Sequence, residues 1–271
     1  MPELPEVETT RRGIEPHLLG RRVAEVVVRD GRLRWPVPDS LALELRGLRI
    51  DAVQRRAKYL LLRAGDGTAI LHLGMSGSLR ILPAEQDPTQ HDHIDIILDD
   101  GFCLRFRDPR RFGSLHWTLA NPLEHKLLRA LGPEPLADEF CGAWLHARSR
   151  RRRVAIKNFL MDSHTVVGVG NIYASEALCR AGIDPRRAAG RISARRYDEL
   201  VACVRETLTL AIAAGGTTLR DFKDSEGKPG YFGQELLVYG REGQPCAHCE
   251  GHIERIVQGA RATYFCRSCQ R

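Results

Sequence analysis

CAHCEGHIERIVQGARATYFCRSC, residues 246–269, is the stretch that decides the C-terminal fold of this chain. It holds two CxxC pairs, Cys246 with Cys249 and Cys266 with Cys269, and residues 250–265 separate them. Four thiolates in this spacing can surround Zn²⁺ tetrahedrally, and the residues between the pairs suffice for a β-hairpin. Because so short a segment has too little core to fold alone, metal binding must supply its folding free energy. The stretch predicts a hairpin closed by one structural Zn²⁺.

The same stretch admits other interpretations. A redox CxxC would be a single motif near a β-α-β pattern, and this sequence lacks that pattern. His248 and His252 lie close enough to replace a cysteine ligand, although four cysteines make the simpler site. The hairpin also carries Arg255 and Arg261, which suit either a phosphate groove or a solvated face. The spacing alone does not decide between these two roles.

The remaining cysteines are scattered singly in apolar or helical surroundings, which is typical of buried or free thiols. The clustering of the other four argues against a disulfide framework for the whole chain. The scattered cysteines are Cys103, Cys141, Cys179 and Cys203.

The composition is that of a globular protein with a moderate positive charge. At 271 residues with 43% hydrophobic residues, the chain is long enough for about two domains with real cores. Its 41 basic and 34 acidic residues give a net charge of +7, which favours a nucleic-acid partner only slightly. The sequence shows no signal peptide and no apolar run of about 18 residues. We therefore expect a cytoplasmic protein without a membrane span.

The hydrophobic pattern changes twice along the chain. Residues 4–13 suit a helix, and residues 22–117 alternate as short strands of an antiparallel sandwich or barrel, with a hairpin signal at "DDG". Proline and glycine mark a boundary near residues 131–135, after which the pattern is helical. A polar, glycine-rich stretch then precedes the cysteines, and loops of this length are usually functional or disordered. This order predicts an α+β protein of several domains.

Two features of the helical part could hold phosphate. "ARSRRRRVAIK" places five arginines, Arg152 among them, within a few residues of Lys157. Such runs are usually solvated, but this one is dense enough to favour phosphate contact. "VVGVGNIYASE" predicts a glycine-rich approach to a helix that begins near Asn171, where exposed amides and the helix dipole favour an anion.

Two turns in the strand-rich part carry apolar residues beside glycine or arginine. In "RFRDPRRFGS", Phe112 follows Arg110 and Arg111, so it could enter a base stack while the arginines hold phosphates or an unpaired base. In "LGMSGS", Met75 could be an exposed wedge in the same way. Inward packing of either side chain is the alternative, and neither motif decides the matter alone.

Taken together, several motifs resemble one family in the expected order from residue 2 to 270. They are MPELPEVE, KYLLL, HLGMSGSLR, HDHIDI, DPRRFG, VVGVGNIYASEALCRAGI, GKPGYFGQELLVYGREGQPC and the two CxxC pairs. The chain resembles the bacterial formamidopyrimidine-DNA glycosylases, bifunctional base-excision repair enzymes that act on oxidised purines such as 8-oxoguanine. The related endonuclease VIII proteins usually have glycine where this chain has Leu4, so "PELPE" favours the purine branch.

The resemblance implies a fold of three parts. These are an N-terminal antiparallel β-sandwich with an N-terminal helix (residues 1–132), a helix-two-turn-helix DNA-binding domain with a lesion-capping loop (133–240) and a zinc finger (241–271). The loop that closes over a flipped base would be residues 217–230. "CRSC" departs from the family at Arg267, where proline is common, and this should leave the ligation unchanged.

The resemblance also implies roles for single residues. Pro2, exposed once Met1 is removed, would be the nucleophile, Glu3 the neighbouring acid or base, and Lys58 and Arg261 further catalytic residues. Without the resemblance, Lys58 would be interpreted as a snorkelling lysine and Glu3 as a helix-start acid. The DNA-contacting positions implied by the resemblance are His91, Arg110, Arg152 and Asn171, and the residues that fill the space left by an extruded nucleotide are Met75, Arg110 and Phe112.

These roles imply one reaction, and two alternative functions remain. A secondary amine at Pro2 would form a Schiff base and cleave the strand of damaged double-stranded DNA by β,δ-elimination. An endonuclease VIII-like enzyme for oxidised pyrimidines would share this chemistry, whereas a non-catalytic zinc-ribbon DNA-binding protein would not need Pro2. No feature demands an oligomer, so we expect a monomer.

Overall fold

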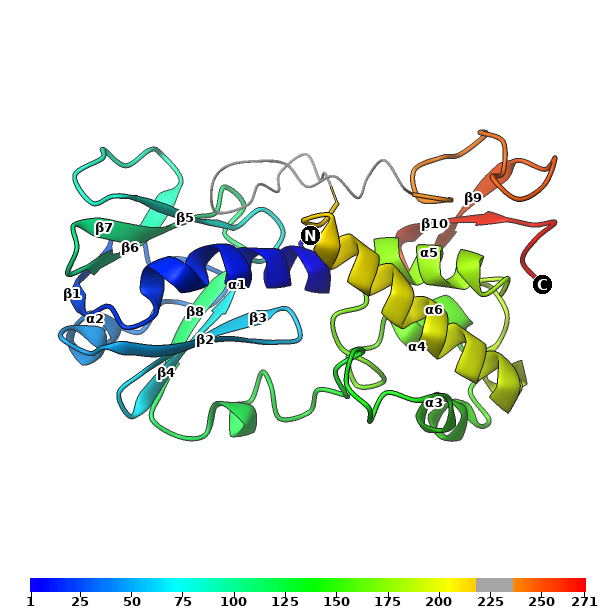
Figure 1. Cartoon of the computed structure of the whole chain (residues 1–271), viewed down its shortest axis with the longest axis horizontal. Coiled ribbons are helices and arrows are strands. Elements are labelled where there is room, and N and C mark those ends of the chain that lie inside the picture. Colours follow the sequence, from blue (N-terminus) through cyan, green and yellow to red (C-terminus); the bar gives the residue numbers. More distant parts are fainter. Residues whose placement is uncertain (218–235) are drawn as a thin grey trace. The chain divides into compact units, whose positions relative to one another are not determined.

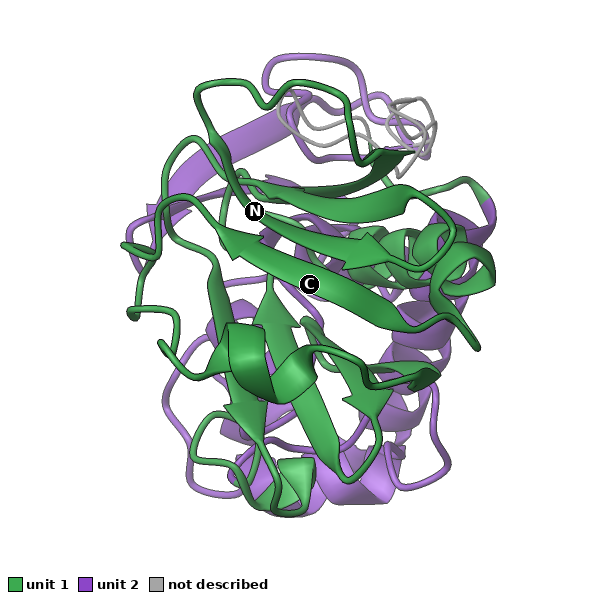
Figure 2. Ribbon diagram, turned by 90° about the vertical axis from the view of Figure 1, so that its left-hand side faces the viewer, with its two compact units in different colours: residues 1–129, 214–233 green, residues 130–213, 234–271 purple. Residues whose placement is uncertain are grey.

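The computed structural model describes residues 1–217 and 236–271. The chain folds as two units, Met1–Arg129 with Ala214–Gly233 and Ala130–Ala213 with Gln234–Arg271 (Figure 2). The predicted fold class is confirmed: antiparallel sheets form the first unit, and helices with a C-terminal hairpin form the second (Figure 1). The three-domain division of the sequence stays a prediction.

The first unit begins with a helix that its own sequence defines well. Helix α1 spans Leu4–Leu18, with Pro5 in its first turn and Glu3 at the N-cap. It runs past the predicted end at residue 13 because Ile14 and Leu18 continue the buried face, and both are fully buried. The helix packs against strands of both sheets, so it lies where the two sheets meet.

Two four-stranded antiparallel sheets make up the body of this unit. One sheet has the order β1-β6-β7-β5 and the other the order β2-β3-β4-β8. The "DDG" signal is confirmed, since Asp99, Asp100 and Gly101 connect β6 to β7. The elements are β1 (Val23–Val28), α2 (Leu41–Leu45), β2 (Ile50–Arg56), β3 (Tyr59–Ala64), β4 (Gly67–His72), β5 (Ser78–Pro83), β6 (Asp92–Leu98), β7 (Phe102–Arg107), β8 (Ser114–Thr118) and the 3₁₀ turn η1 (Pro122–Glu124). Helix α2, a single turn, was not predicted.

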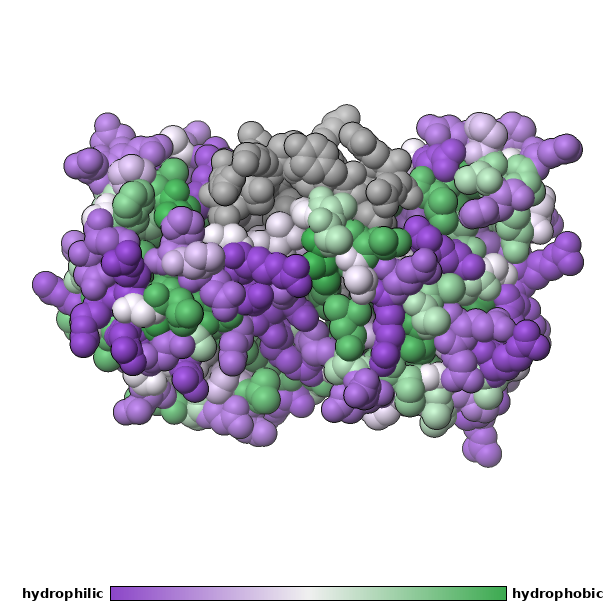
Figure 3. All heavy atoms as spheres, in the orientation of Figure 1, coloured by the Kyte–Doolittle hydropathy of each residue, from purple (hydrophilic) through white to green (hydrophobic). Residues whose placement is uncertain are grey.

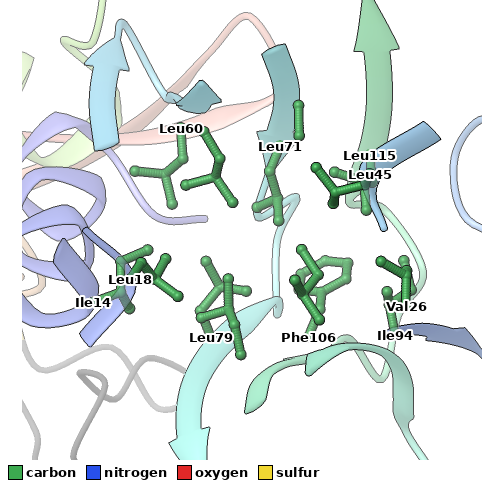
Figure 4. Close-up of a cluster of buried hydrophobic side chains, with 14 of the residues drawn as sticks. Ile14, Leu18, Val26, Leu45, Leu60, Leu71, Leu79, Ile94, Phe106 and Leu115 are labelled. Atoms are coloured by element: carbon green, nitrogen blue, oxygen red, sulfur yellow. The ribbon is translucent and has the colours of Figure 1, made fainter. Parts of the chain in front are cut away.

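The hydrophobic core of the first unit lies between the two sheets. Figure 4 shows two facing rows of side chains, with Leu60, Leu71 and Leu115 on one side and Leu79 and Phe106 on the other. All of them are at most 2% exposed. A sandwich of this kind buries one face of each strand, which is why apolar and polar residues alternate along the strands. The rigid core supports the turns at the strand ends, where the candidate site residues lie.

The second unit joins a group of helices to a two-stranded hairpin. The long helix α6 packs against α3 and α5, and α5 also contacts β10 (Figure 1). Ser193 accepts a hydrogen bond from the amide of Arg196, as expected of a helix cap. The elements are α3 (Gly142–Ser149), α4 (Ile156–Leu160), α5 (Asn171–Arg180), the 3₁₀ turn η2 (Ala189–Arg191), α6 (Ala194–Ala213), β9 (Ile253–Gln258) and β10 (Arg261–Cys266).

The molecular surface mixes apolar and polar side chains. In the part of the chain that the structure describes, no helix has the length and apolar character needed to span a bilayer. On the face shown in Figure 3, hydrophobic residues form separate patches among hydrophilic ones. The candidate wedge residues Met75 and Phe112 are among the exposed apolar side chains, 37% and 43% exposed respectively.

Candidate functional site

The N-terminus is held by a buried carboxylate. Glu3 and Glu6 form a reciprocal capping box at the start of α1, in which the amide of Glu3 donates to Glu6 Oε2 over 2.8 Å. Glu6 Oε1 also accepts from the amide of Thr217 over 2.9 Å, and Glu6 is fully buried. One carboxylate therefore fixes both the backbone next to Pro2 and the last residue described before the gap. The predicted loop 217–230 lies outside the described residues from position 218 onward.

Lys58 lies in the β2–β3 turn, close to a histidine from the next strand. The turn consists of Ala57 and Lys58, and Ala57 adopts a positive φ of 56°. His72, at the end of β4, packs its ring 4.7 Å from that of Tyr59 and accepts a hydrogen bond from the amide of Gly74 through Nδ1. Burial, together with the positive charges of Lys58 and Arg34, lowers the pKa of His72 to about 4. His72 is therefore neutral at physiological pH.

The two turns that carry the candidate wedge residues are in direct contact. A Cβ atom on Gly74 would lie 2.4 Å from the amide nitrogen of Gly113, so the backbones touch at a point where only glycine fits. Met75 follows the first glycine and Phe112 precedes the second, and the guanidinium carbon of Arg110 lies 5.0 Å from the centre of the Phe112 ring. The structure thus brings the three predicted wedge residues together.

The three wedge residues line one open cavity of about 700 Å³. Met1 lines the same cavity, as do His72 and the arginines of two loops. Guanidinium groups beside exposed apolar side chains suit a nucleic acid, because the cations attract phosphates while the apolar groups stack on bases.

His91 immediately precedes β6, and a backbone hydrogen bond holds it in place. Its carbonyl accepts from the amide of Asp108 over 3.0 Å. The loop before it is fixed by Arg105, which donates to the carbonyls of Gln86 and Asp87 and pairs with the buried Asp95 over 2.8 Å. The buried ion pair makes the position of His91 depend on the core of the sheet rather than on the loop alone.

The second unit contains a polar network around Asn171. Asn171 begins α5, as predicted, and its Nδ2 donates to the carbonyl of Ala262 over 3.0 Å. Lys157 Nζ donates to Asn171 Oδ1 over 2.6 Å, to Ala262 O over 3.0 Å and to Thr263 Oγ1 over 2.7 Å. The network joins α4, the start of α5 and strand β10, so it positions Asn171 against the hairpin that carries Arg261.

The position of Lys157 corrects an expectation. The sequence grouped it with the arginine run as a phosphate contact, but Lys157 is fully buried while Arg152 is exposed. Its ammonium points inward because β10 and Asn171 supply acceptors. Arg152 lines a small cavity of about 120 Å³ with Arg148 and Asn158, and Arg261 is exposed at the hairpin turn that follows Gln258.

The four cysteines of the CxxC pairs form a cluster suited to zinc. All four Sγ atoms lie within 4.8 Å of one another, with Cys246 and Cys269 separated by 3.8 Å and Cys249 and Cys266 by 3.5 Å. Tetrahedral ligation with Zn–S bonds of about 2.3 Å requires sulfur separations near ~3.8 Å. The thiols therefore fit one structural Zn²⁺, which they would hold against the hairpin β9–β10.

Comparison with known proteins matches three family models along the chain. Residues 1–115 match the formamidopyrimidine-DNA glycosylase N-terminal domain, residues 131–223 the formamidopyrimidine-DNA glycosylase H2TH domain, and residues 243–271 the zinc finger found in FPG and IleRS. A protein of Syntrophotalea carbinolica named formamidopyrimidine-DNA glycosylase is 61% identical over 271 residues, which is the full length of both chains. The chain belongs to the formamidopyrimidine-DNA glycosylase family.

Solved structures support the same assignment. The MutM (Fpg) protein of Thermus thermophilus is 39% identical, with 99% of this chain and 98% of that chain covered and a TM-score of 0.89. A variant of the Lactococcus lactis FPG, in a complex with a Fapy-dG-containing DNA, is 31% identical over 100% of both chains with a TM-score of 0.93. The predicted family and the predicted zinc-finger hairpin are both confirmed.

Sequence reasoning missed two buried carboxylates that support parts of the candidate site. Glu176 on α5 is fully buried, and its carboxylate accepts from the backbone amides of residues 237, 238 and 239 over 2.8–3.0 Å. Asp108 is likewise fully buried between the wedge turns. Acidic side chains next to arginines and helices look like surface residues in a sequence, and only their contacts identify them as supports of the site.

Proposed function

We propose that this protein is a bifunctional DNA glycosylase and AP lyase that removes oxidised purines, 8-oxoguanine and formamidopyrimidines, from damaged double-stranded DNA. The observation that carries the proposal is that Met1 lines the same cavity as Met75, Arg110 and Phe112. Removal of Met1 would leave the amine of Pro2 at the edge of a cavity with an apolar wedge. The names of the relatives and the Fapy-dG DNA in the Lactococcus lactis complex support the same substrate class.

The wedge has a physical purpose in this reaction. The glycosidic carbon of a base is out of reach inside the duplex, so the nucleotide must be extruded at a cost of a few kcal/mol. Met75 and Phe112 would fill the space that the nucleotide leaves, and Arg110 would pair with the base that stays behind. Met75 and Phe112 are both exposed and line one open cavity, as is typical of an interaction site, and contact with bases would account for their position.

Pro2 would then act as the nucleophile. Its nitrogen is an amide while Met1 is attached, but it becomes a secondary amine once Met1 is removed, and α-amino groups with their ordinary pKa of about 8 are partly neutral at physiological pH. The amine nitrogen forms a bond to the sugar C1′ as the bond to the base breaks, and the base leaves with a proton. Opening of the sugar ring gives an iminium, a Schiff base whose positive charge accepts electrons from the C2′–H bond. Loss of that proton breaks the C3′–O bond, and a second elimination breaks the C5′–O bond.

Glu3 and Lys58 are the proposed proton-transfer groups. Glu3 follows the nucleophile directly, and its backbone is fixed by the carboxylate of Glu6. We assign it to proton exchange with the sugar and the amine. Lys58 lies beside the neutral His72, which cannot repel a cation at physiological pH. A lysine at this place can hold a phosphate and exchange protons during the eliminations.

The remaining assignments concern DNA binding. His91, Arg152, Asn171 and Arg261 would contact the DNA backbone, with Arg261 also taking part at the reacting site. The four cysteines would hold one Zn²⁺ that supplies folding free energy to the hairpin, so the metal has a structural role. We further propose a monomer that works in the bacterial cytoplasm at the chromosomal DNA, with the three domains at residues 1–132, 133–240 and 241–271.

Borohydride trapping tests the covalent step. A removable peptide fused before Pro2 in place of Met1 blocks the amine, so the same chain can be assayed before and after the peptide is cut off. We expect a borohydride-reduced protein–DNA adduct on Pro2, and strand cleavage at 8-oxoguanine, only after cutting. Full activity of the blocked chain would contradict the proposal. Trapping that stays unchanged in Pro2→Gly would show that any terminal amine suffices.

Substrate panels separate the rival functions. A faster reaction on 8-oxoguanine and formamidopyrimidine duplexes than on oxidised-pyrimidine duplexes supports the proposal. The reverse order would identify an endonuclease VIII-like enzyme. DNA binding without any strand cleavage by the cut chain would identify a non-catalytic zinc-ribbon DNA-binding protein.

A further inference from the structure

Asp108 lies at the point where the two wedge turns and the chain segment at His91 meet. It follows β7 directly and is fully buried. Its Oδ1 accepts from the hydroxyl of Ser76 over 2.7 Å, and its Oδ2 accepts from the amide of Gly113 over 2.7 Å. One carboxylate therefore binds one group from each turn.

Each wedge residue is at most one position away from a group in this cluster. Met75 precedes Ser76, and Phe112 precedes Gly113. The amide of Arg110 itself donates to Ser76 Oγ over 3.1 Å. Because hydrogen bonds to a carboxylate are stronger than those between neutral groups, the cluster fixes the backbone of all three wedge residues against one anion.

The backbone of Asp108 extends the cluster in two further directions. Its amide donates to the carbonyl of His91 over 3.0 Å, and its own carbonyl accepts from His93 Nε2 over 2.9 Å. The carbonyl also accepts from the amide of Arg111 over 3.2 Å. A residue that uses both carboxylate oxygens, its amide and its carbonyl on three chain segments controls how those segments lie relative to one another.

The turn after Asp108 needs such support. Arg111 adopts a φ of 57°, the left-handed region that residues with a Cβ rarely occupy. Strained conformations of this kind persist only where the surroundings over-determine them, and they gather at functional sites. The strain lies between Arg110 and Phe112, so its release would change the direction of both side chains.

We propose that Asp108 is the positioning residue of the wedge: its carboxylate sets the spacing of Met75, Arg110 and Phe112 that nucleotide extrusion requires. This inference rests on the proposed function, since the wedge acts on DNA only if the protein extrudes a nucleotide. Asp108 itself contacts no DNA in this role. It acts on the step before bond breaking.

Two variants and a matched control test the proposal in the zinc-loaded full chain with Pro2 exposed. Asp108→Asn keeps the shape but leaves only one oxygen to accept, and Ser76→Ala removes one arm of the cluster and the acceptor for Arg110. Ser114→Ala is the control, because Ser114 is also buried beside Gly113 while its Oγ has no hydrogen-bond partner within the described residues. Circular dichroism melting checks that each variant is folded.

The activity readout compares two duplexes that differ in the need for extrusion. Misplacement of positioning groups by about 1 Å can slow a reaction about 100-fold, so we expect Asp108→Asn to slow single-turnover excision of 8-oxoguanine by about 10- to 100-fold. Cleavage at a preformed abasic site, which has no base pair to break, should stay within about threefold of the parent chain. The excision rate of Ser76→Ala should lie between those of the parent chain and Asp108→Asn. Ser114→Ala should match the rates of the parent chain on both duplexes.

Hydrogen exchange gives a second readout that does not depend on activity. Exchange at residues 74–77 and 110–113 should rise together in Asp108→Asn and stay unchanged in Ser114→Ala. Parent-like excision by both Asp108→Asn and Ser76→Ala, or equal slowing on the two duplexes, would overturn the proposal. If the parent chain excises no 8-oxoguanine while hydrogen exchange in both turns still rises in Asp108→Asn, the proposed function is refuted. The Asp108 cluster would then be a purely structural feature.

Discussion

The contact between the two wedge turns makes Gly74→Ala the most informative single substitution in the first unit. Gly74 has a φ of 67°, and an added Cβ would lie 2.4 Å from both the nitrogen of Gly113 and the carbonyl carbon of Phe112. Since 3.4 Å is an ordinary contact, the turns would have to separate by about 1 Å. The atoms that must move are backbone atoms, which cannot rotate away as a side chain can.

Gly101→Ala is the matched control for backbone strain. Gly101 has a φ of 84°, but nothing lies within 4 Å of a Cβ built on it. Both substitutions place an L-residue in the left-handed region, which costs about 1–2 kcal/mol. Gly74→Ala adds overpacking of about 1–3 kcal/mol, so the difference between the two variants isolates the contact between the turns.

Thermal melting and single-turnover excision measure the two consequences. For a unit of this size about 1 kcal/mol corresponds to roughly 2–4 °C in Tm, so the overpacking of about 1–3 kcal/mol should make Gly74→Ala melt roughly 2–12 °C below Gly101→Ala. Excision of 8-oxoguanine should fall about 10- to 100-fold in Gly74→Ala, because the wedge is displaced by about 1 Å, and stay unchanged in Gly101→Ala. Equal Tm values together with equal rates would refute the close contact of the turns as described.

Two further predictions concern the metal and the pH dependence. Cys266→Ser or a strong chelator should remove the one Zn²⁺ per chain, measured by elemental analysis, and weaken binding to an abasic-site duplex. The control Cys141→Ser should keep both the Zn²⁺ and the binding. DNA binding that survives zinc loss would exclude a role for the hairpin in binding. His72, whose pKa is lowered from 6.5 to about 4, stays neutral in the folded state while it gains a proton in the unfolded state. The free energy of unfolding should therefore fall as pH drops from 6.5 to 4, by at most about 3 kcal/mol from this group. His72→Asn should flatten part of that slope in urea unfolding. His116 and His125, whose pKa values burial also lowers, contribute to the remaining slope. An unchanged slope in His72→Asn would contradict the assignment.

The sequence predicted those parts of the molecule that depend on residues close together in the chain. The cysteine spacing identified the zinc cluster and its hairpin, the "DDG" turn joined two strands, and the glycines before Asn171 marked the start of α5. Each of these features is determined by local backbone geometry or by a fixed ligand spacing, so periodicity and turn chemistry suffice to find it. Helix α2 was not predicted because Leu41–Leu45 is too short to display a helical period.

The supports of the site depend on partners far away in the sequence. Lys157 bonds to Thr263 across 106 positions, and Glu6 bonds to Thr217 across 211. A lysine beside arginines and a glutamate in a first turn look like solvated residues in the sequence, because nothing nearby provides their partners. Asp108 was visible within "DPRRFG", but its role depends on the approach of the turn that carries Ser76. Tertiary packing decides the direction of such side chains, and no local signal records it.

As part of the proposed wedge, Met75 would make the protein sensitive to the same chemistry that damages DNA. Of the three methionines in the chain, Met1 would be removed and Met161 is half-buried, whereas Met75 is exposed and lines the open cavity. Peroxide adds an oxygen atom to such a sulfur and gives a polar sulfoxide, which disfavours insertion between bases. Oxidising conditions that raise the number of lesions would thus inactivate the wedge until a sulfoxide reductase restores it. Met75→Leu would keep the apolar bulk and yield a form resistant to peroxide.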